Sequence, residues 1–256
     1  MPASSNPSTP ALWQRVASLL LAFALIAGLF TFAFSTVGYR WNWSGVWVYR
    51  ALFLKGWLVT LLLSAISLVA SCLIGLVLAL LRRARFLPLK YLARIYIETI
   101  RGTPLLVQLL IFYYVVAHSF AIESRYVVGV LTLSVFSGAY ISEVIRSGIE
   151  SVGQSQLDSA RAIGLTTRQT YRYVIFPQAI RQILPPLAGQ FASLIKDSSL
   201  LSIIGINEFA LSAQNVSSYT YSNFESYLPL AVGYLVLTLP ISLWTQSLEQ
   251  RNRFET

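Results

Sequence analysis

The charged side chains that interrupt apolar stretches are the most informative residues of this 256-residue chain. An ionisable group inside a membrane span is costly, so it usually faces a partner or a water-filled cavity. Two acid–arginine pairs recur at a spacing of i, i+3, which puts both members on one helix face and predicts structural ion pairs. At a third place in the sequence, a lysine is directly followed by an aspartate. These residues are Glu98 and Arg101, Glu143 and Arg146, and Lys196 and Asp197.

Lys196 and Asp197 are followed by Ser198 and Ser199, a polar run in otherwise apolar sequence. Such a run predicts irregular backbone, which hydrocarbon tolerates only where protein or water surrounds it. A role in a pathway or gate and a structural role both fit the lysine and the aspartate. The candidates for a polar pathway are Gln108, Tyr140, Glu143, Lys196 and Asp197.

Metal and covalent chemistry find little support in the sequence. Cys72 and His118 are the one cysteine and the one histidine of the chain. A disulfide within the chain is therefore impossible, and the counts argue against a Cys/His metal cluster. Without clustered histidines, a reactive cysteine or paired acids at metal spacing, a membrane-embedded enzyme is poorly supported as well.

Composition places the chain among membrane proteins, because 55% of its residues are hydrophobic and only 11% are charged, against about 25% charged in soluble domains. A bilayer core needs about 20 apolar residues in a helix. The sequence predicts six spans, the fifth opened by two prolines and interrupted by charge. They are Val16–Tyr39, Gly56–Leu81, Gly102–Ile122, Tyr126–Ser142, Gln182–Asn207 and Ser226–Leu248.

Lysine and arginine are distributed unevenly between the two sides that six spans create. With a cytoplasmic N-terminus, thirteen lie in inner segments, four in outer segments and two at or within spans. The positive-inside rule then puts both termini in the cytoplasm. The basic residues that give the formal charge of +9 lie mainly in inner segments, so this charge reflects membrane topology. A nucleic-acid partner is therefore not indicated. Aromatic residues that favour the water–lipid boundary cluster around the first outer loop: Trp41, Trp43, Trp47, Tyr49 and Trp57.

The first apolar run has two interpretations. A cleaved signal peptide would have an apolar region of about 7 to 15 residues and a small-residue cleavage site. This run is longer, and no clear site follows it. We therefore expect a retained span over residues 13–39, preceded by a disordered, Ser/Pro-rich cytoplasmic leader over residues 1–12.

The longest inner interruption, Glu143–Arg181, predicts a helix, a tight turn and a second helix. Ser155 and Asp158 have the spacing of a capping box at the start of the first helix. Gly164 suits its end, because glycine enters the left-handed region cheaply. Thr166 or Thr167 can cap the second helix, and Pro177 begins the return to the membrane.

One face of the first helix is small and shallow, since Leu157, Ala160 and Gly164 follow one another at i, i+3 and i+7. Such a face suits close approach by another protein. The alternative is an amphipathic helix resting on lipid, which normally presents bulky side chains to the acyl chains. The small residues favour contact with protein.

The segment DSARAIGLTTRQTYRYVIFPQA resembles the EAA loop of ABC-importer permeases, in which Glu-Ala-Ala precedes a spaced Gly and a final Ile-x-Leu-Pro. Asp158-Ser159-Ala160 stands at the Glu-Ala-Ala positions, Gly164 keeps its spacing, and Val174-Ile175-Phe176-Pro177 ends the pattern. Asp for Glu, Ser for Ala, Val for Ile and Phe for Leu are departures from the family pattern. The spacing is intact.

Three further segments resemble the polar amino acid permeases, the histidine/glutamine/glutamate/arginine/opine group. They are RGTPLLVQLLIFYY, GAYISEVIRSGIESV and FPQAIRQILPPLAGQFASLIKDSSLLSIIG, in this order along the chain. The resemblance covers about Phe53 to Glu249. It implies an all-α polytopic membrane protein of the ABC type-1 importer fold, with a five-span core and one extra N-terminal span. The transmembrane domain would comprise residues 53–249, with a coupling loop at 150–178 and a cytoplasmic tail at 250–256.

In such families the EAA loop is a coupling helix that docks on an ATP-hydrolysing subunit. This chain has no G-x-x-x-x-G-K-[ST] phosphate loop, so the resemblance assigns ATP and Mg²⁺ to a partner subunit and no cofactor to this chain. The implied partners are two cytoplasmic ATP-binding subunits, an identical or different second permease chain and an extracytoplasmic substrate-binding protein. The coupling contact would involve Asp158, Ser159, Ala160, Arg161, Gly164, Arg168 and Pro177.

The implied function is ATP-driven import of a polar amino acid across the bacterial cytoplasmic (inner) membrane. The carboxylate and ammonium of such a substrate match mixed-sign polar groups in a central cavity. The main alternative is a secondary transporter driven by an ion gradient. Such proteins usually show inverted repeats and midplane sites, whereas no convincing repeat is visible here and a coupling loop would have no purpose.

Overall fold

The computed structural model describes residues 11–36 and 38–252, and all regular elements in this part of the chain are helices. The chain divides into two units, Met1–Asn42 and Trp43–Thr256. The first unit contains α1 (Leu12–Thr36), a helix of 25 residues whose apolar side chains are mostly exposed. The predicted leader and tail fall largely on residues 1–10 and 253–256, outside the described residues.

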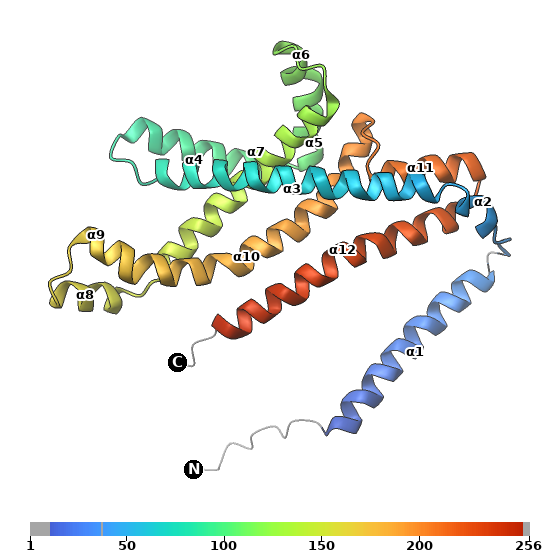
Figure 1. Ribbon diagram of the computed structural model, residues 1–256, viewed down its shortest axis with the longest axis horizontal. Coiled ribbons are helices and arrows are strands. Elements are labelled where there is room, and N and C mark those ends of the chain that lie inside the picture. Colours follow the sequence, from blue (N-terminus) through green and yellow to red (C-terminus); the bar gives the residue numbers. More distant parts are fainter. Residues whose placement is uncertain (1–10, 37, 253–256) are drawn as a thin grey trace. The chain divides into compact units, whose positions relative to one another are not determined.

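The second unit carries all the other helices. One end of this unit contains the turn between α3 and α4, together with α8 and α9 (Figure 1). α2 and α11 lie toward the other end. The elements are α2 (Trp43–Trp47), α3 (Arg50–Leu81), α4 (Leu87–Gly102), α5 (Leu105–Ile111), the π-helix η1 (Phe112–Val116), α6 (Ala117–Ser119), α7 (Arg125–Glu150), α8 (Gln154–Ala162), α9 (Thr167–Thr170), the π-helix η2 (Tyr171–Ile175), α10 (Phe176–Asp197), the 3₁₀-helix η3 (Ser198–Ile204), α11 (Phe209–Thr220) and α12 (Asn223–Asn252).

Four described helices, α1, α3, α7 and α12, are long and apolar enough to cross a bilayer. A fifth span would consist of α4 followed by Leu105–Ser119, two segments bent by 111°. The predicted fifth span, Gln182–Asn207, differs most from the structure. There α10 begins earlier, at Phe176, runs through both prolines and changes to 3₁₀ geometry after Asp197. The count of six spans stays a prediction.

α3 and α7 form the central helix pair of the second unit. Each presents a glycine to an isoleucine of the other: a Cβ on Gly75 would lie 2.7 Å from Cγ2 of Ile141. Likewise, a Cβ on Gly138 would lie 2.6 Å from Cγ2 of Ile74. Small residues let helix backbones approach closely where lipid offers no hydrophobic driving force. This seam therefore fixes α7, the helix that leads to α8.

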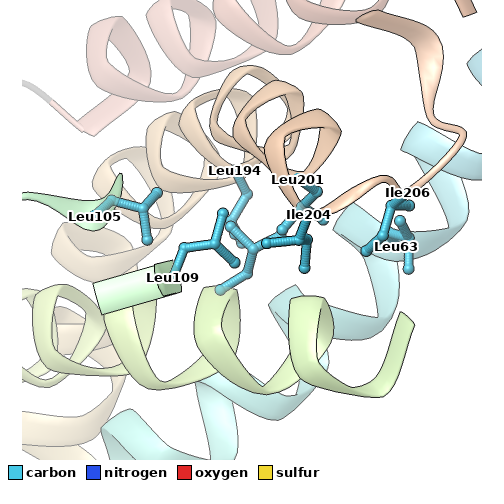
Figure 2. Packing of buried hydrophobic residues seen from close by; sticks show 8 residues of the cluster. Leu63, Leu105, Leu109, Leu194, Leu201, Ile204 and Ile206 are labelled. Atoms are coloured by element: carbon cyan, nitrogen blue, oxygen red, sulfur yellow. The ribbon is translucent and has the colours of Figure 1, made fainter. Parts of the chain in front are cut away.

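An apolar cluster joins α5, α7 and α10 to η3. Figure 2 shows Leu105 and Leu109 of α5 lying close to Leu194 of α10 and to Leu201 and Ile204 of η3. All five side chains are buried. The polar run at the end of α10 is thus anchored by apolar neighbours on both sides.

The side chain of Gln108 stabilises the break between α4 and α5 by hydrogen bonding to its backbone. Its Nε2 atom donates to the carbonyl oxygens of Ile100 and Thr103, at 2.8 and 3.1 Å, and to Oγ1 of Thr103, at 2.8 Å. Carbonyls at a helix C-terminus lack helical donors. Gln108, a candidate for the polar pathway, is only 5% exposed and in this conformation serves the backbone of the break.

Glu208 joins three helices at the start of α11. Its carboxylate accepts hydrogen bonds from the backbone N–H groups of Ala210 and Leu211, at 2.9 and 2.8 Å. It also accepts from the hydroxyls of Thr60 in α3, at 3.2 Å, and Tyr234 in α12, at 3.1 Å. The side chain is fully buried. Because four donors converge on it, Glu208 both caps α11 and ties α11 to α3 and α12.

Candidate functional site

The hairpin of α8 and α9 begins differently from the sequence prediction. The N-cap residue of α8 is Gly153, with extended backbone and no side-chain cap. The predicted capping box of Ser155 and Asp158 is therefore wrong, because the helix already includes both residues. Asp158 instead accepts hydrogen bonds from Gln154, at 3.0 Å, and Arg161, at 3.2 Å.

The end of α8 confirms the role predicted for Gly164. Its φ is +77°, in the left-handed region. Its N–H donates to the carbonyl of Arg161 at 2.9 Å, and the N–H of Leu165 donates to that of Ala160 at 3.0 Å. These two bonds define a Schellman motif, which satisfies carbonyls at the helix end. The sharp turn between the helices therefore depends on glycine.

The second helix starts with the capping box that the first one lacks. Oγ1 of Thr166 accepts from the N–H of Gln169, whose side chain accepts from the N–H of Thr166. From α9 the chain continues through η2 into α10 without leaving helical geometry. Pro177, which has no N–H, directly follows the π-helix η2, so the helical hydrogen-bond pattern changes just before it. A continuous helical path thus joins the hairpin to Asp197.

Exposure within the hairpin separates inner from outer residues. Ala160 is only 3% exposed, so it packs inside the hairpin and does not face outward as predicted. Its small side chain lets α8 lie close to α9 and η2. Ile163, by contrast, is 76% exposed at the tip. Asp158, Ser159, Arg161, Gly164 and Arg168 are exposed as well.

Ile163 is the functional candidate that the sequence analysis did not single out. Because its side chain is exposed, Ile163 does not contribute to packing within this chain. An exposed apolar side chain next to small and polar ones suits contact with another protein. The sequence does contain a pattern that could have identified Ile163, because a bulky apolar residue directly precedes the glycine that ends the helix.

A polar cleft of about 410 Å³ lies between the end of α4, α7 and α10. Tyr140 and Glu143, both predicted pathway residues, line it together with Arg101. The guanidinium of Arg101 stacks over the ring of Tyr140, 5.4 Å from its centroid. Gln182 and Gln190 of α10 complete the polar part of the lining. The cleft therefore offers positive, negative and neutral hydrogen-bonding groups within one small volume.

Glu143 is surrounded by three arginines. Its two carboxylate oxygens lie 2.5 Å from Nη2 of Arg146 and 2.5 Å from Nη1 of Arg82, and Nη1 of Arg101 is 3.9 Å away. The first of these is the predicted pair at i, i+3. Arg146 also pairs with Glu150, so the three arginines face two carboxylates and exceed them by one. Arg101, the most distant of the three from Glu143, keeps positive charge for a further anion in or near the cleft.

The predicted pair of Glu98 with Arg101 is wrong. Glu98 pairs with Arg94, one helical turn earlier, at 2.7 Å. Arg101 belongs to the last turn of α4, next to the bend, and its side chain reaches α7 instead. Lys196 and Asp197 do not line the cleft. Lys196 is exposed, and Asp197 is partly buried where α10 gives way to η3.

Comparison with known sequences gives the chain its family. The sequence model of the binding-protein-dependent transport system inner membrane components matches residues 71–254. The chain belongs to this family. It is therefore a permease, the membrane component of an ABC transport system, and the matched range begins within α3 and includes the hairpin and the cleft.

Curated relatives of the permease cover most of its length. The probable glutamine ABC transporter permease protein GlnM of Bacillus subtilis (strain 168) is 37% identical over 201 residues, 78% of this chain and 93% of the relative. The glutamine transport system permease protein GlnP of Escherichia coli (strain K12) is 34% identical over 215 residues, 83% of this chain and 98% of the relative.

Solved structures share the fold. An amino acid ABC transporter crystallised with histidines has a chain 38% identical to the permease, with a TM-score of 0.78, covering 83% of this chain and 100% of that chain. The inward-facing MetNI methionine ABC transporter is 16% identical, with a TM-score of 0.64, and shares the fold alone.

Proposed function

We propose that this permease imports polar amino acids and that ATP hydrolysis in two partner subunits drives the transport through the α8–α9 hairpin. The observation that carries the proposal is the exposed tip of the hairpin, Ile163 beside the left-handed Gly164. Such a rigid, partly apolar tip is suited to insertion into a groove of another protein. The relatives named as glutamine permeases support the substrate class.

Movement at the hairpin has a direct route into the membrane domain. η2 and α10 continue from α9 as one helical path, and α10 packs against α7 and α12. A partner that closes and pushes the hairpin would therefore shift α10 relative to α3 and α7. Nucleotide can drive this change only through contacts that differ between the inward-facing and outward-facing states.

The cleft of Arg101, Tyr140 and Glu143 is the part of the proposed substrate pathway with the clearest chemistry. A zwitterionic amino acid presents a carboxylate, which the Arg101 guanidinium in the cleft matches. Gln182 and Gln190 offer neutral hydrogen-bonding groups to the rest of the substrate, because Glu143 already pairs with arginines. Gln108, Lys196 and Asp197 lie elsewhere, and we keep them as pathway candidates for other conformations of the transporter. The external binding protein would deliver the substrate from the opposite side.

The proposed orientation follows the basic residues. The turn after α3 and the α8–α9 hairpin lie toward the same end of the second unit (Figure 1). They hold Arg82, Arg83, Arg85, Arg161 and Arg168. By the positive-inside rule this end faces the cytoplasm, where ATPase subunits are located, with both chain termini on that side of a bacterial inner membrane.

Reconstitution separates ATP-driven import from transport driven by an ion gradient. We expect vesicles containing the permease, its ATPase and its binding protein to accumulate labelled glutamine only when ATP reaches the ATPase side. Vesicles without the ATPase should show no uptake, even under an imposed proton or sodium gradient. Uptake that follows the ion gradient without ATP would overturn the proposal, and the alternative of a secondary transporter would replace it.

A further inference from the structure

A second cavity, separate from the polar cleft, lies between the end of α3, the first part of α4 and the end of α7. Its volume is about 340 Å³, within the usual range of small-ligand pockets. Five cationic side chains line it against only two carboxylates, those of Glu98 and Glu150. The cations are Arg82, Arg83, Lys90, Arg94 and Arg146.

Two of the five cations are available to a ligand. The other three already pair with carboxylates of the protein: Arg82 with Glu143, Arg94 with Glu98, and Arg146 with Glu143 and Glu150. Arg83 and Lys90 form no ion pair with any residue that the structure describes, and both are exposed. The cavity therefore attracts anions through charges that the protein itself leaves uncompensated.

The start of α4 adds to this attraction. Lys90 lies in the first turn of this 16-residue helix, and that first turn contains no acidic residue. Its N-cap residue, Phe86, makes no side-chain cap hydrogen bond. Pro88 has no N–H and the N–H of Lys90 donates to the carbonyl of Phe86. The positive end of the helix dipole is thus left without a side-chain acceptor and favours an external anion.

Exposed apolar side chains occupy neighbouring positions on the same helices. Leu80 of α3, Phe86 before α4, and Leu87, Leu92 and Ile95 of α4 are all more than half exposed. α3 is long and apolar enough to cross a bilayer and α4 belongs to a candidate broken span, so these side chains would face acyl chains and place the cavity at the lipid boundary. A phospholipid would satisfy both features, because its phosphate carries the charge and its acyl chains cover the apolar positions.

We propose that this cavity binds the headgroup phosphate of an anionic phospholipid, with Arg83 and Lys90 as its main contacts. Basic pockets between membrane helices on the cytoplasmic side suit acidic headgroups. The placement of the cavity on the inner leaflet rests on the orientation proposed above. The binding itself does not, so it can fail or succeed independently of the transport function.

The test uses the full permease purified in detergent and titrated with short-chain phosphatidylglycerol, with bound lipid counted by native mass spectrometry. Each basic residue near an anionic headgroup contributes about 1 kcal/mol. We therefore expect the double variant Arg83→Gln, Lys90→Gln to bind phosphatidylglycerol about 30-fold more weakly. Phosphatidylcholine should bind weakly to both proteins. Because both residues are exposed, the single variant Lys90→Gln serves if the double variant is unstable.

The matched control removes two other exposed inner arginines, in the double variant Arg85→Gln, Arg172→Gln. We expect this variant to keep wild-type affinity. An equal loss in both variants would attribute binding to the general surface potential and overturn the proposal. Inorganic phosphate that competes with an affinity equal to that of the lipid would assign the cavity to a free anion and also overturn it. Unchanged phosphatidylglycerol binding by the variant Arg83→Gln, Lys90→Gln would overturn it as well.

Discussion

Replacing Ile163 by aspartate is expected to abolish ATP-dependent uptake while membrane insertion and thermal stability stay unchanged. The side chain is 76% exposed, so the change removes almost no contact within the permease. In the proposed docked state, however, the aspartate would be buried in a groove without a partner charge. Such burial costs about 3 kcal/mol or more, which weakens docking about 100-fold. Uptake and stimulated ATPase activity in reconstituted vesicles measure the effect.

Two further variants serve as controls for this result. Ser155→Asp adds the same charge to an exposed position of α8, and we expect it to keep uptake near the wild-type rate. Ile163→Val keeps an apolar tip and should retain most of the activity. Normal uptake by Ile163→Asp, or an equal loss in Ser155→Asp, would remove Ile163 from the proposed contact.

Substitution of Gly164 is less informative than substitution of Ile163. A Cβ at this position would meet no atom within 4 Å, but the φ of +77° strains any L-residue. A variant such as Gly164→Trp would therefore disturb the Schellman turn as well as block docking. Loss of uptake in that variant would not separate the two causes.

The largest expected effect on stability belongs to Glu208→Ala. The substitution leaves two backbone N–H groups and the hydroxyls of Thr60 and Tyr234 without their acceptor in a buried site. Each buried polar group left unsatisfied costs about 1–3 kcal/mol, and water entering the new space offsets part of this. Because water offsets part of the cost for the four groups, we expect the free energy of unfolding to fall by about 3–5 kcal/mol in total. Thermal unfolding of the purified permease in detergent measures the loss.

Glu123→Ala provides the comparison for this prediction. Glu123 is an exposed glutamate in the connection between α6 and α7, so its replacement should change the unfolding temperature little. Glu208→Gln should lie between the two, because its amide keeps one acceptor oxygen but turns a donor toward a donor. A Glu208→Ala variant as stable as the wild type would show that the four hydrogen bonds add nothing.

The sequence predicted those parts of the hairpin that depend on local backbone preferences. Gly164 and Thr166 act on residues within one turn of themselves, so local patterns predicted the end of α8 and placed the start of α9 at Thr166 or Thr167, of which the structure has Thr166. Ser155 failed as a cap because Gly153, two residues earlier, takes the extended conformation and lets the helix begin sooner. A capping pattern alone could not decide between these neighbouring starts.

Contacts between segments that are distant in the sequence could not be predicted from local patterns. The pairing of Arg101 with α7 depends on the bend after α4, which no spacing within α4 reveals. Glu208 gave no signal, because one of its donors, Thr60, is 148 residues away in the chain. The inward orientation of Ala160 likewise depends on how α8 packs against η2, and helical periodicity identified the face but not its neighbour.

The most direct test of the account is a photo-crosslinking residue placed at position 163 in the assembled transporter. We expect it to form adducts with the ATPase subunit, and these should change in yield when ATP is added. The same residue at Tyr219, an exposed position in α11 toward the other end of the unit (Figure 1), should form none. Absence of an ATPase adduct from position 163, or equal adducts from both positions, would contradict the proposed coupling through the α8–α9 hairpin.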